Sequence, residues 1–155
     1  MRPVPTLLIV HHTTSPALEE LLESVLAGAR ANQLAEAGIA VELRPALAAT
    51  VPDVLAADGF VLGTPANIGY MSGALKHFFD QIYYPCRVAK QGAPYGLYVH
   101  GNQDTSGAVR AVETIAAGLG WRPVHAPVVV LGPPTREVRE ACWELGATVA
   151  ATLAA

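Results

Sequence analysis

The sequence is poor in charge and in cysteine, and it contains no run of basic residues. Only 15% of its 155 residues are charged, and the formal net charge is −3. Nucleic-acid binding needs clustered Lys and Arg to neutralise phosphates, so a nucleic-acid partner is not expected. The two cysteines, Cys86 and Cys142, form no CxxC pair. This favours free thiols in a reducing compartment over a disulfide scaffold.

Long hydrophobic segments are also missing. Near the N-terminus the strongly apolar run Leu7–Val10 is too short for a secretory signal. The Ala-rich C-terminal segment is too short to span a bilayer. We therefore expect a cytoplasmic protein with no membrane partner.

What the sequence does have is apolar residues, at 52% of the chain. A length of 155 residues suits a single domain, 1–155, because chains usually divide above roughly 250 residues. Short apolar runs predict strands, and stripes with i, i+3, i+4 spacing predict helices between them. The predicted strands are Leu7–Val10, Ile39–Leu43, Phe60–Gly63, Leu97–His100 and Val128–Leu131. The predicted helical stripes are Leu18–Ala29, Leu75–Ile82, Val109–Leu119 and Val138–Val149, with a shorter helix in Val51–Ala57.

This alternation predicts an α/β fold, a three-layer α/β/α sandwich around a five-stranded parallel sheet. Most of the strands are continuously hydrophobic, as in sheets covered on both faces, whereas Ile39–Leu43 alternates and suits an edge. Ser15 and Pro16 form an N-cap and first-position pair, and Gly38 and Gly120 suit helix C-caps. The pair 133–134, both prolines, is expected to open the last helix.

In such sheets ligands bind beyond the C-terminal ends of the strands. The first segment leaving such an end, His11–Ala17, has three successive hydroxyls before a helix start, which favours an anion site. Ordinary helix capping by Ser15 is the alternative. The third segment, His100–Ala108, is rich in Gly, Asn, Gln and Asp. A polar turn with Asp104 or Thr105 as cap is its alternative.

The second segment, "TPANIGYMSG", is an irregular and uncharged loop between a buried strand and a helix. Gly69 allows the backbone to approach a flat ligand closely. Tyr70 and Met71 can lie against a ring system. The alternative is a helix-capping loop with Ser72 or Thr64 as cap.

With "GTPANIGYMSGALKHFFD" at Gly63–Asp80, the chain resembles the flavodoxin-fold FMN proteins, especially the NAD(P)H-dependent FMN and quinone reductase branch. The resemblance implies the strand order 2-1-3-4-5. It also implies FMN as cofactor, with the phosphate at His12, Thr13, Thr14 and Ser15. The implied contacts to the isoalloxazine ring are Pro65, Ala66, Asn67, Ile68, Gly69, Tyr70, Met71, Gly101, Asn102, Gln103, Asp104 and Gly107. The first loop departs from the family's Ser/Thr-x-Thr-Gly-x-Thr pattern, with Ser15 at the glycine and Ala17 at the last threonine.

If FMN binds, the flavin carries the redox chemistry, and no catalytic acid or base is expected from the chain. The resemblance favours an NAD(P)H-dependent flavin or quinone oxidoreductase, with a small-molecule electron acceptor or a redox partner protein. A flavodoxin-type electron carrier or a noncatalytic FMN-binding protein is the alternative, although carriers are usually strongly acidic. Family members often form homodimers, so a homodimer is a further expectation.

Other classes of protein require residues that this chain lacks at the corresponding positions. A signalling receiver domain needs acidic residues after the first strand and a phosphorylatable Asp ending the third, where this chain has His11–His12 and Gly63–Pro65. A low-molecular-weight tyrosine phosphatase needs a cysteine and an arginine in the first loop. No HxH, HxxxH or Cys/His cluster is present, so no metal is expected.

Overall fold

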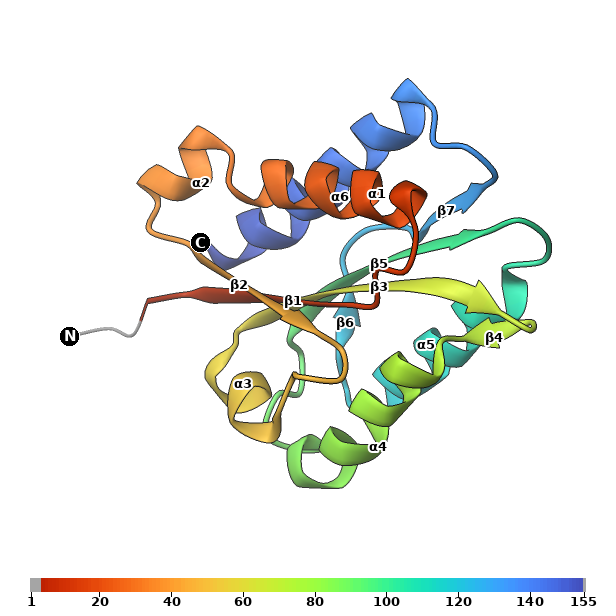
Figure 1. The fold of residues 1–155 in the computed structure, drawn as a ribbon. Helices are drawn as coiled ribbons and strands as arrows, with labels where there is room; N and C mark the ends of the chain where they lie inside the picture. The colour runs from red at the N-terminus through yellow and green to blue at the C-terminus, as the bar shows by residue number, and fades with distance from the viewer. Residues whose placement is uncertain (1–3, 155) are drawn as a thin grey trace.

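The computed structural model describes residues 4–154 as a three-layer arrangement around a parallel sheet (Figure 1). The sheet has the order β2-β1-β3-β5, and the short strands β6 and β7 both pair with β5. Among the strands formed by residues 4–154, β4 alone is antiparallel, and it pairs with the end of β3. The strands are β1 (Thr6–His11), β2 (Ala40–Pro45), β3 (Gly59–Asn67), β4 (Tyr70–Met71), β5 (Pro94–Gly101), β6 (Arg122–Pro123) and β7 (Val128–Leu131).

The predicted sheet is confirmed. Strand β6 lies beside the start of β5 and β7 beside its end, so together they occupy the fifth position of the order 2-1-3-4-5. Strand β2 pairs only with β1 among the described strands, and it is the edge strand that its alternating pattern predicted. Strand β5 is buried along its whole length, as its continuous hydrophobicity indicated.

Helices cover both faces of the sheet (Figure 1). On one face lie α1 (Pro16–Ala29), α2 (Asn32–Glu36) and α6 (Arg136–Leu153), and on the other lie α3 (Val51–Ala56), α4 (Gly73–Cys86) and α5 (Ser106–Gly118). Each face has its own hydrophobic core. In the core under α4 and α5, the rings of Phe60 and Trp121 stack with centroids 4.0 Å apart. None of the described helices is both long and apolar enough to cross a membrane.

Capping side chains mark the starts of α1, α3, α4 and α6. The Ser15 hydroxyl accepts a hydrogen bond from the N–H of Leu18 at 3.2 Å, and Pro16 occupies the first turn, as predicted. The last helix begins later than expected. It starts at Arg136, with Thr135 as N-cap, so Pro133 lies in the connection before it. Proline at the first helical position would fit, but here the hydroxyl cap sets the boundary.

The largest departure from expectation is in the segment Thr64–Gly73, which is not an irregular loop. Strand β3 continues to Asn67 and then folds back into β4. The two residues of the turn have positive φ, 51° at Ile68 and 73° at Gly69, which is the sign pattern of a type I′ hairpin turn. The base of the hairpin is fixed by Thr64, whose hydroxyl accepts from the N–H of Ser72 at 3.0 Å and donates to the carbonyl of Pro65 at 2.8 Å.

Candidate functional site

Three segments meet at the edge of the sheet where the parallel strands end, on the right of Figure 1. They are the β1–α1 connection at 12–15, the β3–β4 hairpin, and the β5–α5 connection at 102–105. Because β1, β3 and β5 are parallel neighbours, their C-terminal ends necessarily lie at the same edge. The fold thus brings together the three segments that the sequence singled out.

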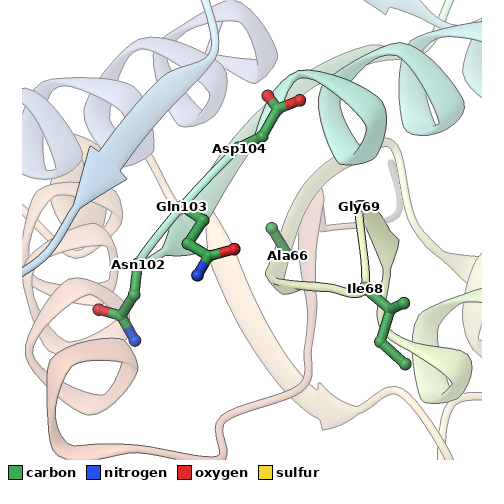
Figure 2. Close-up of a pocket in the computed structure, with 6 residues that line it drawn as sticks. All are labelled: Ala66, Ile68, Gly69, Asn102, Gln103 and Asp104. Atoms are coloured by element: carbon green, nitrogen blue, oxygen red, sulfur yellow. The ribbon is translucent and has the colours of Figure 1, made fainter.

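A hollow of about 440 Å³ lies between the hairpin and the β5–α5 connection. We call it the first hollow. Figure 2 shows Gln103 with its carboxamide directed across the hollow toward Ala66. The volume is in the usual range for small-molecule sites. Its lining residues are Ala66, Ile68, Gly69, Asn102, Gln103 and Asp104.

The first hollow presents neutral donors and acceptors rather than charge. Its one carboxylate, Asp104, points away from the hollow in Figure 2. That carboxylate accepts hydrogen bonds from the hydroxyl of Ser106 at 2.7 Å and from its N–H at 2.9 Å. The Ser106 hydroxyl, followed by its N–H, lowers the pKa of Asp104. The carboxamides of Asn102 and Gln103 therefore provide the main polar groups, and these can both donate and accept.

The β1–α1 connection is anchored to the sheet and leads into a helix start. The N–H of His12 donates to the carbonyl of Gly63 at 3.0 Å. The Nδ1 of His11 lies 2.8 Å from the hydroxyl of Thr13, and burial lowers the pKa of His11. The Nδ1 of His12 is buried and has no hydrogen-bond partner among the described residues. This nitrogen is an unsatisfied polar atom in the connection that leads into the N-terminus of α1, and a ligand bound there would be able to provide its missing partner.

The structure places the predicted site residues in different parts of this edge of the sheet. Six of them line the first hollow, as given above. Two, Tyr70 and Gly107, line a second hollow instead. Three are buried, namely Pro65, Met71 and Gly101, whereas Asn67 is exposed on the hairpin. The remaining four, His12, Thr13, Thr14 and Ser15, form the β1–α1 connection and line neither hollow.

Sequence reasoning missed the second hollow, which has a volume of about 420 Å³ and lies between the hairpin and α5. Besides Gly69, Tyr70 and Gly107 it is lined by Arg110, Ala111, Thr114 and Ile115. The i, i+4 pairs 107/111 and 110/114 show that these residues share one face of the helix. This spacing does not predict that a hairpin packs against that face, so it does not predict a hollow there.

Gly107 explains how the hairpin rests on α5. A Cβ at Gly107 would lie 1.9 Å from the carbonyl oxygen of Gly69, closer than any side-chain atom can approach. A glycine is therefore required for this contact. The hairpin tip is held directly against the helix, so Gly69 borders both hollows at a fixed position.

Residues 12–134 match the family described as NADPH-dependent FMN reductase, and the chain belongs to this family. A flavodoxin of Aquifex aeolicus (strain VF5) is 28% identical to this chain over an alignment that is 162 residues long including gaps. The alignment covers 92% of this chain and 84% of the relative.

Solved structures show the same fold. A flavodoxin from the domain Archaea matches with a TM-score of 0.78 at 15% identity, over 96% of this chain and 98% of that one. A flavodoxin, WrbA-like protein from Agrobacterium tumefaciens matches with a TM-score of 0.75 at 19% identity, over 96% and 97% of the two chains. The resemblance seen in the sequence is thus confirmed, and FMN is the cofactor that it supports.

The residues at this edge fit FMN. A helix N-terminus with hydroxyls and an unpartnered imidazole nitrogen suits a phosphate, although Pro16 removes one backbone donor. A neutral hollow bordered by Gly69 and two carboxamides suits a flat ring with polar edges. Among residues 4–154, no group of three or more His, Cys, Asp or Glu side chains is placed to hold a metal ion.

Proposed function

We propose that the chain binds FMN at the C-terminal edge of its sheet and acts as an NAD(P)H-dependent oxidoreductase. The electron acceptor would be a small molecule such as a quinone or a free flavin. One observation carries the proposal: the neutral first hollow lies between the hairpin and the β5–α5 connection, at the edge where α1 begins. Membership of the NADPH-dependent FMN reductase family supports the choice of reductant.

The residues have distinct roles in this proposal. The N-terminus of α1, with Thr13, Thr14 and Ser15, would hold the phosphate, because its free N–H groups and helix dipole favour an anion. The buried Nδ1 of His12 would gain the partner it lacks within the described chain. When bound, FMN supplies the redox chemistry. The chain binds and orients it without charged side chains, whose burial against the ring would cost desolvation energy.

The carboxamides of Asn102 and Gln103 would orient the ring by hydrogen bonds to its polar edge. A carboxamide offers a donor and an acceptor on one side chain, so either residue can match a carbonyl or an N–H of the ligand. The hairpin would provide the opposing wall through Ala66 and the backbone at Gly69. This wall packs closely on α5, because Gly107 leaves room for the carbonyl of Gly69.

A flavodoxin-type electron carrier is the second candidate, and the similarity to a flavodoxin of Aquifex aeolicus favours it. Carriers use strong negative charge to steer toward basic partners. The net charge of −3 on 155 residues provides little steering of this kind, which favours the enzyme. A homodimer, expected from the resemblance, stays a prediction. Tyr84 near the end of α4 and Val88 just after it are exposed apolar side chains that such an interface could cover.

The visible spectrum of the purified protein, with FMN titration of any apoprotein, tests whether the chain binds FMN. Replacing Asn102 or Gln103 with alanine should raise the Kd for FMN about threefold to tenfold, the effect of one lost neutral hydrogen bond. Gln33→Ala, an exposed glutamine on α2, is the matched control and should leave the Kd unchanged. If the wild-type protein takes up no FMN, the proposal is wrong.

Anaerobic reduction separates the enzyme from the carrier. NADPH and NADH are added to the FMN-loaded protein, first alone and then with a quinone. Bleaching of the flavin followed by repeated turnover with the quinone supports the oxidoreductase. If neither NADPH nor NADH bleaches the flavin but dithionite does, the result supports the carrier.

A further inference from the structure

The second hollow has a composition unlike that of the first. It lies between the hairpin and the exposed face of α5, and it shares Gly69 with the first hollow. One ligand can therefore extend from one hollow to the other past the hairpin tip. At this boundary the hairpin tip approaches α5 so closely that position 107 has no room for a Cβ.

Arg110 gives the second hollow a positive charge. Its side chain is exposed, and it forms no ion pair with any residue from 4 to 154. Asp104 is the acidic group close enough for Arg110 to influence, and its carboxylate is already engaged by Ser106. The guanidinium is thus free to bind a phosphate through two parallel hydrogen bonds.

The rest of the lining suits an aromatic base. Tyr70 is 40% exposed and lines the hollow, so part of its ring surface is available to a ligand. Ala111 and Ile115 add apolar surface beside it. The hydroxyl of Thr114 donates to the carbonyl of Arg110 at 2.8 Å, which leaves its oxygen free to accept a hydrogen bond from a base or a ribose.

We infer that the second hollow binds the phosphate-bearing adenosine half of NAD(P)H, with a phosphate at Arg110 and the adenine against Tyr70. The inference rests on the proposed function, because the nicotinamide must reach the FMN site. With the isoalloxazine in the first hollow, a dinucleotide bound past the hairpin tip would lay its nicotinamide against the flavin and its adenosine half in the second hollow. The charge of Arg110 matches the phosphates of that half, while the ring of the reduced nicotinamide is uncharged and needs no charged partner beside the flavin.

The test uses FMN-loaded protein with Arg110→Gln, Arg110→Lys and the matched control Arg122→Gln. Arg122 is an exposed arginine on β6, beside the start of β5 and thus at the opposite edge of the sheet. The first measurement is binding of adenosine 2′,5′-bisphosphate by calorimetry, which needs no turnover. The second is the KM for NADPH and for NADH in steady-state assays.

Arg110→Gln should raise the Kd of the bisphosphate and the KM for NADPH about tenfold, as expected for one lost charge-assisted interaction. Arg110→Lys should retain part of the affinity, since it keeps the positive charge but loses the two parallel hydrogen bonds of the guanidinium. Arg122→Gln should match the wild type, and the Kd for FMN should be unchanged in all variants. A KM increase for both nucleotides places the pyrophosphate at Arg110, whereas an increase for NADPH alone places the 2′-phosphate there.

Unchanged Kd and KM values in Arg110→Gln would overturn the inference while leaving the oxidoreductase proposal intact. If neither nucleotide reduces the wild-type flavin, the proposed function fails, and bisphosphate binding alone then decides whether the second hollow is a nucleotide site. Tyr70→Ala gives an independent check, because it should weaken bisphosphate binding whereas Tyr70→Phe should preserve it. Equal binding by the two Tyr70 variants would remove the adenine from this position.

Discussion

Replacing Ile68 with asparagine should stabilise the protein and weaken its binding of FMN. Ile68 has a φ of 51° at the hairpin tip and is fully exposed, at 105% of the reference area. A β-branched residue is strained in this left-handed region because its Cβ crowds the following carbonyl. Asparagine tolerates the same backbone, and Asn-Gly is the preferred pair in a type I′ turn. Because the side chain is exposed, the substitution removes no packing from the core.

The left-handed conformation costs an L-residue roughly 1 to 2 kcal/mol, and asparagine avoids a large part of this cost. We therefore expect the free energy of unfolding to rise by about 1 kcal/mol. For a chain of this size, that corresponds to an increase in Tm of roughly 2 to 4 °C. The substitution also removes apolar surface from the first hollow, which Ile68 lines. Covering about half of an isoleucine side chain with ligand is worth roughly 1 kcal/mol, or about a fivefold change in Kd.

The assay measures urea unfolding and thermal unfolding of the apoprotein, and FMN titration of the same samples. Ile68→Val is the matched control, because it keeps the branched Cβ and most of the apolar surface. It should leave both stability and FMN affinity close to the wild type. A Tm for Ile68→Asn at or below that of the wild type would refute the claim of backbone strain. A stabilised variant with unchanged FMN affinity would confirm the strain and refute the role of Ile68 in the site.

The remaining predictions concern buried groups. Tyr98 is completely buried and its hydroxyl has no hydrogen-bond partner among the described residues, so Tyr98→Phe should leave the free energy of unfolding unchanged or raise it by about 1 kcal/mol, measured by urea unfolding. A loss of more than about 1 kcal/mol, on the order of a buried hydrogen bond, would show that the hydroxyl has a partner. Burial lowers the pKa of His11 below its ordinary 6.5, which favours the neutral ring in the folded state. The stabilisation from this residue is complete above about pH 6.5 and is lost as the pH falls below it, so the pH dependence of stability between about pH 7.5 and 5.5 should be shallower in His11→Gln than in the wild type. Burial raises the pKa of Cys142 to about 12 and that of Cys86 above its usual value, so a thiol reagent should modify both cysteines only after unfolding. Rapid modification of the native protein at neutral pH would contradict the burial of these thiols.

The hydrophobic pattern predicted the sheet well because its central strands are buried on both faces. Strands β3 and β5 have no polar face, so their cores read as continuous apolar runs that only a covered parallel sheet accommodates. The start of α1 was equally predictable, since Ser15 and Pro16 act through contacts within four residues. The start of α6 was not, because two prolines outweighed the threonine cap that follows them.

The hairpin could not be predicted because its defining residues carry opposite local signals. Pro65 is disfavoured in central strands because it lacks a ladder donor, and it lies where β3 leaves the sheet and joins β4. Ile68 is a poor turn residue, yet the structure holds it in the left-handed region at the tip. The hydroxyl of Thr64 and the contact of Gly107 with Gly69 provide the compensating interactions, and the second of these joins positions that are distant in sequence.

In the proposed arrangement the phosphate sites are separate from the ring site. This separation explains how a weakly charged chain would bind two strongly anionic ligands. A buried charge beside a flat ring would cost several kcal/mol in desolvation, so the first hollow is neutral. In the proposed arrangement the phosphates would instead be bound at the periphery, one at the solvent-facing N-terminus of α1 and the other at the exposed Arg110. Neither site removes a charged side chain from water. Binding energy from the phosphate ends can then position the rings between them without a charge in the redox centre, and Arg110→Gln should therefore change KM much more than kcat.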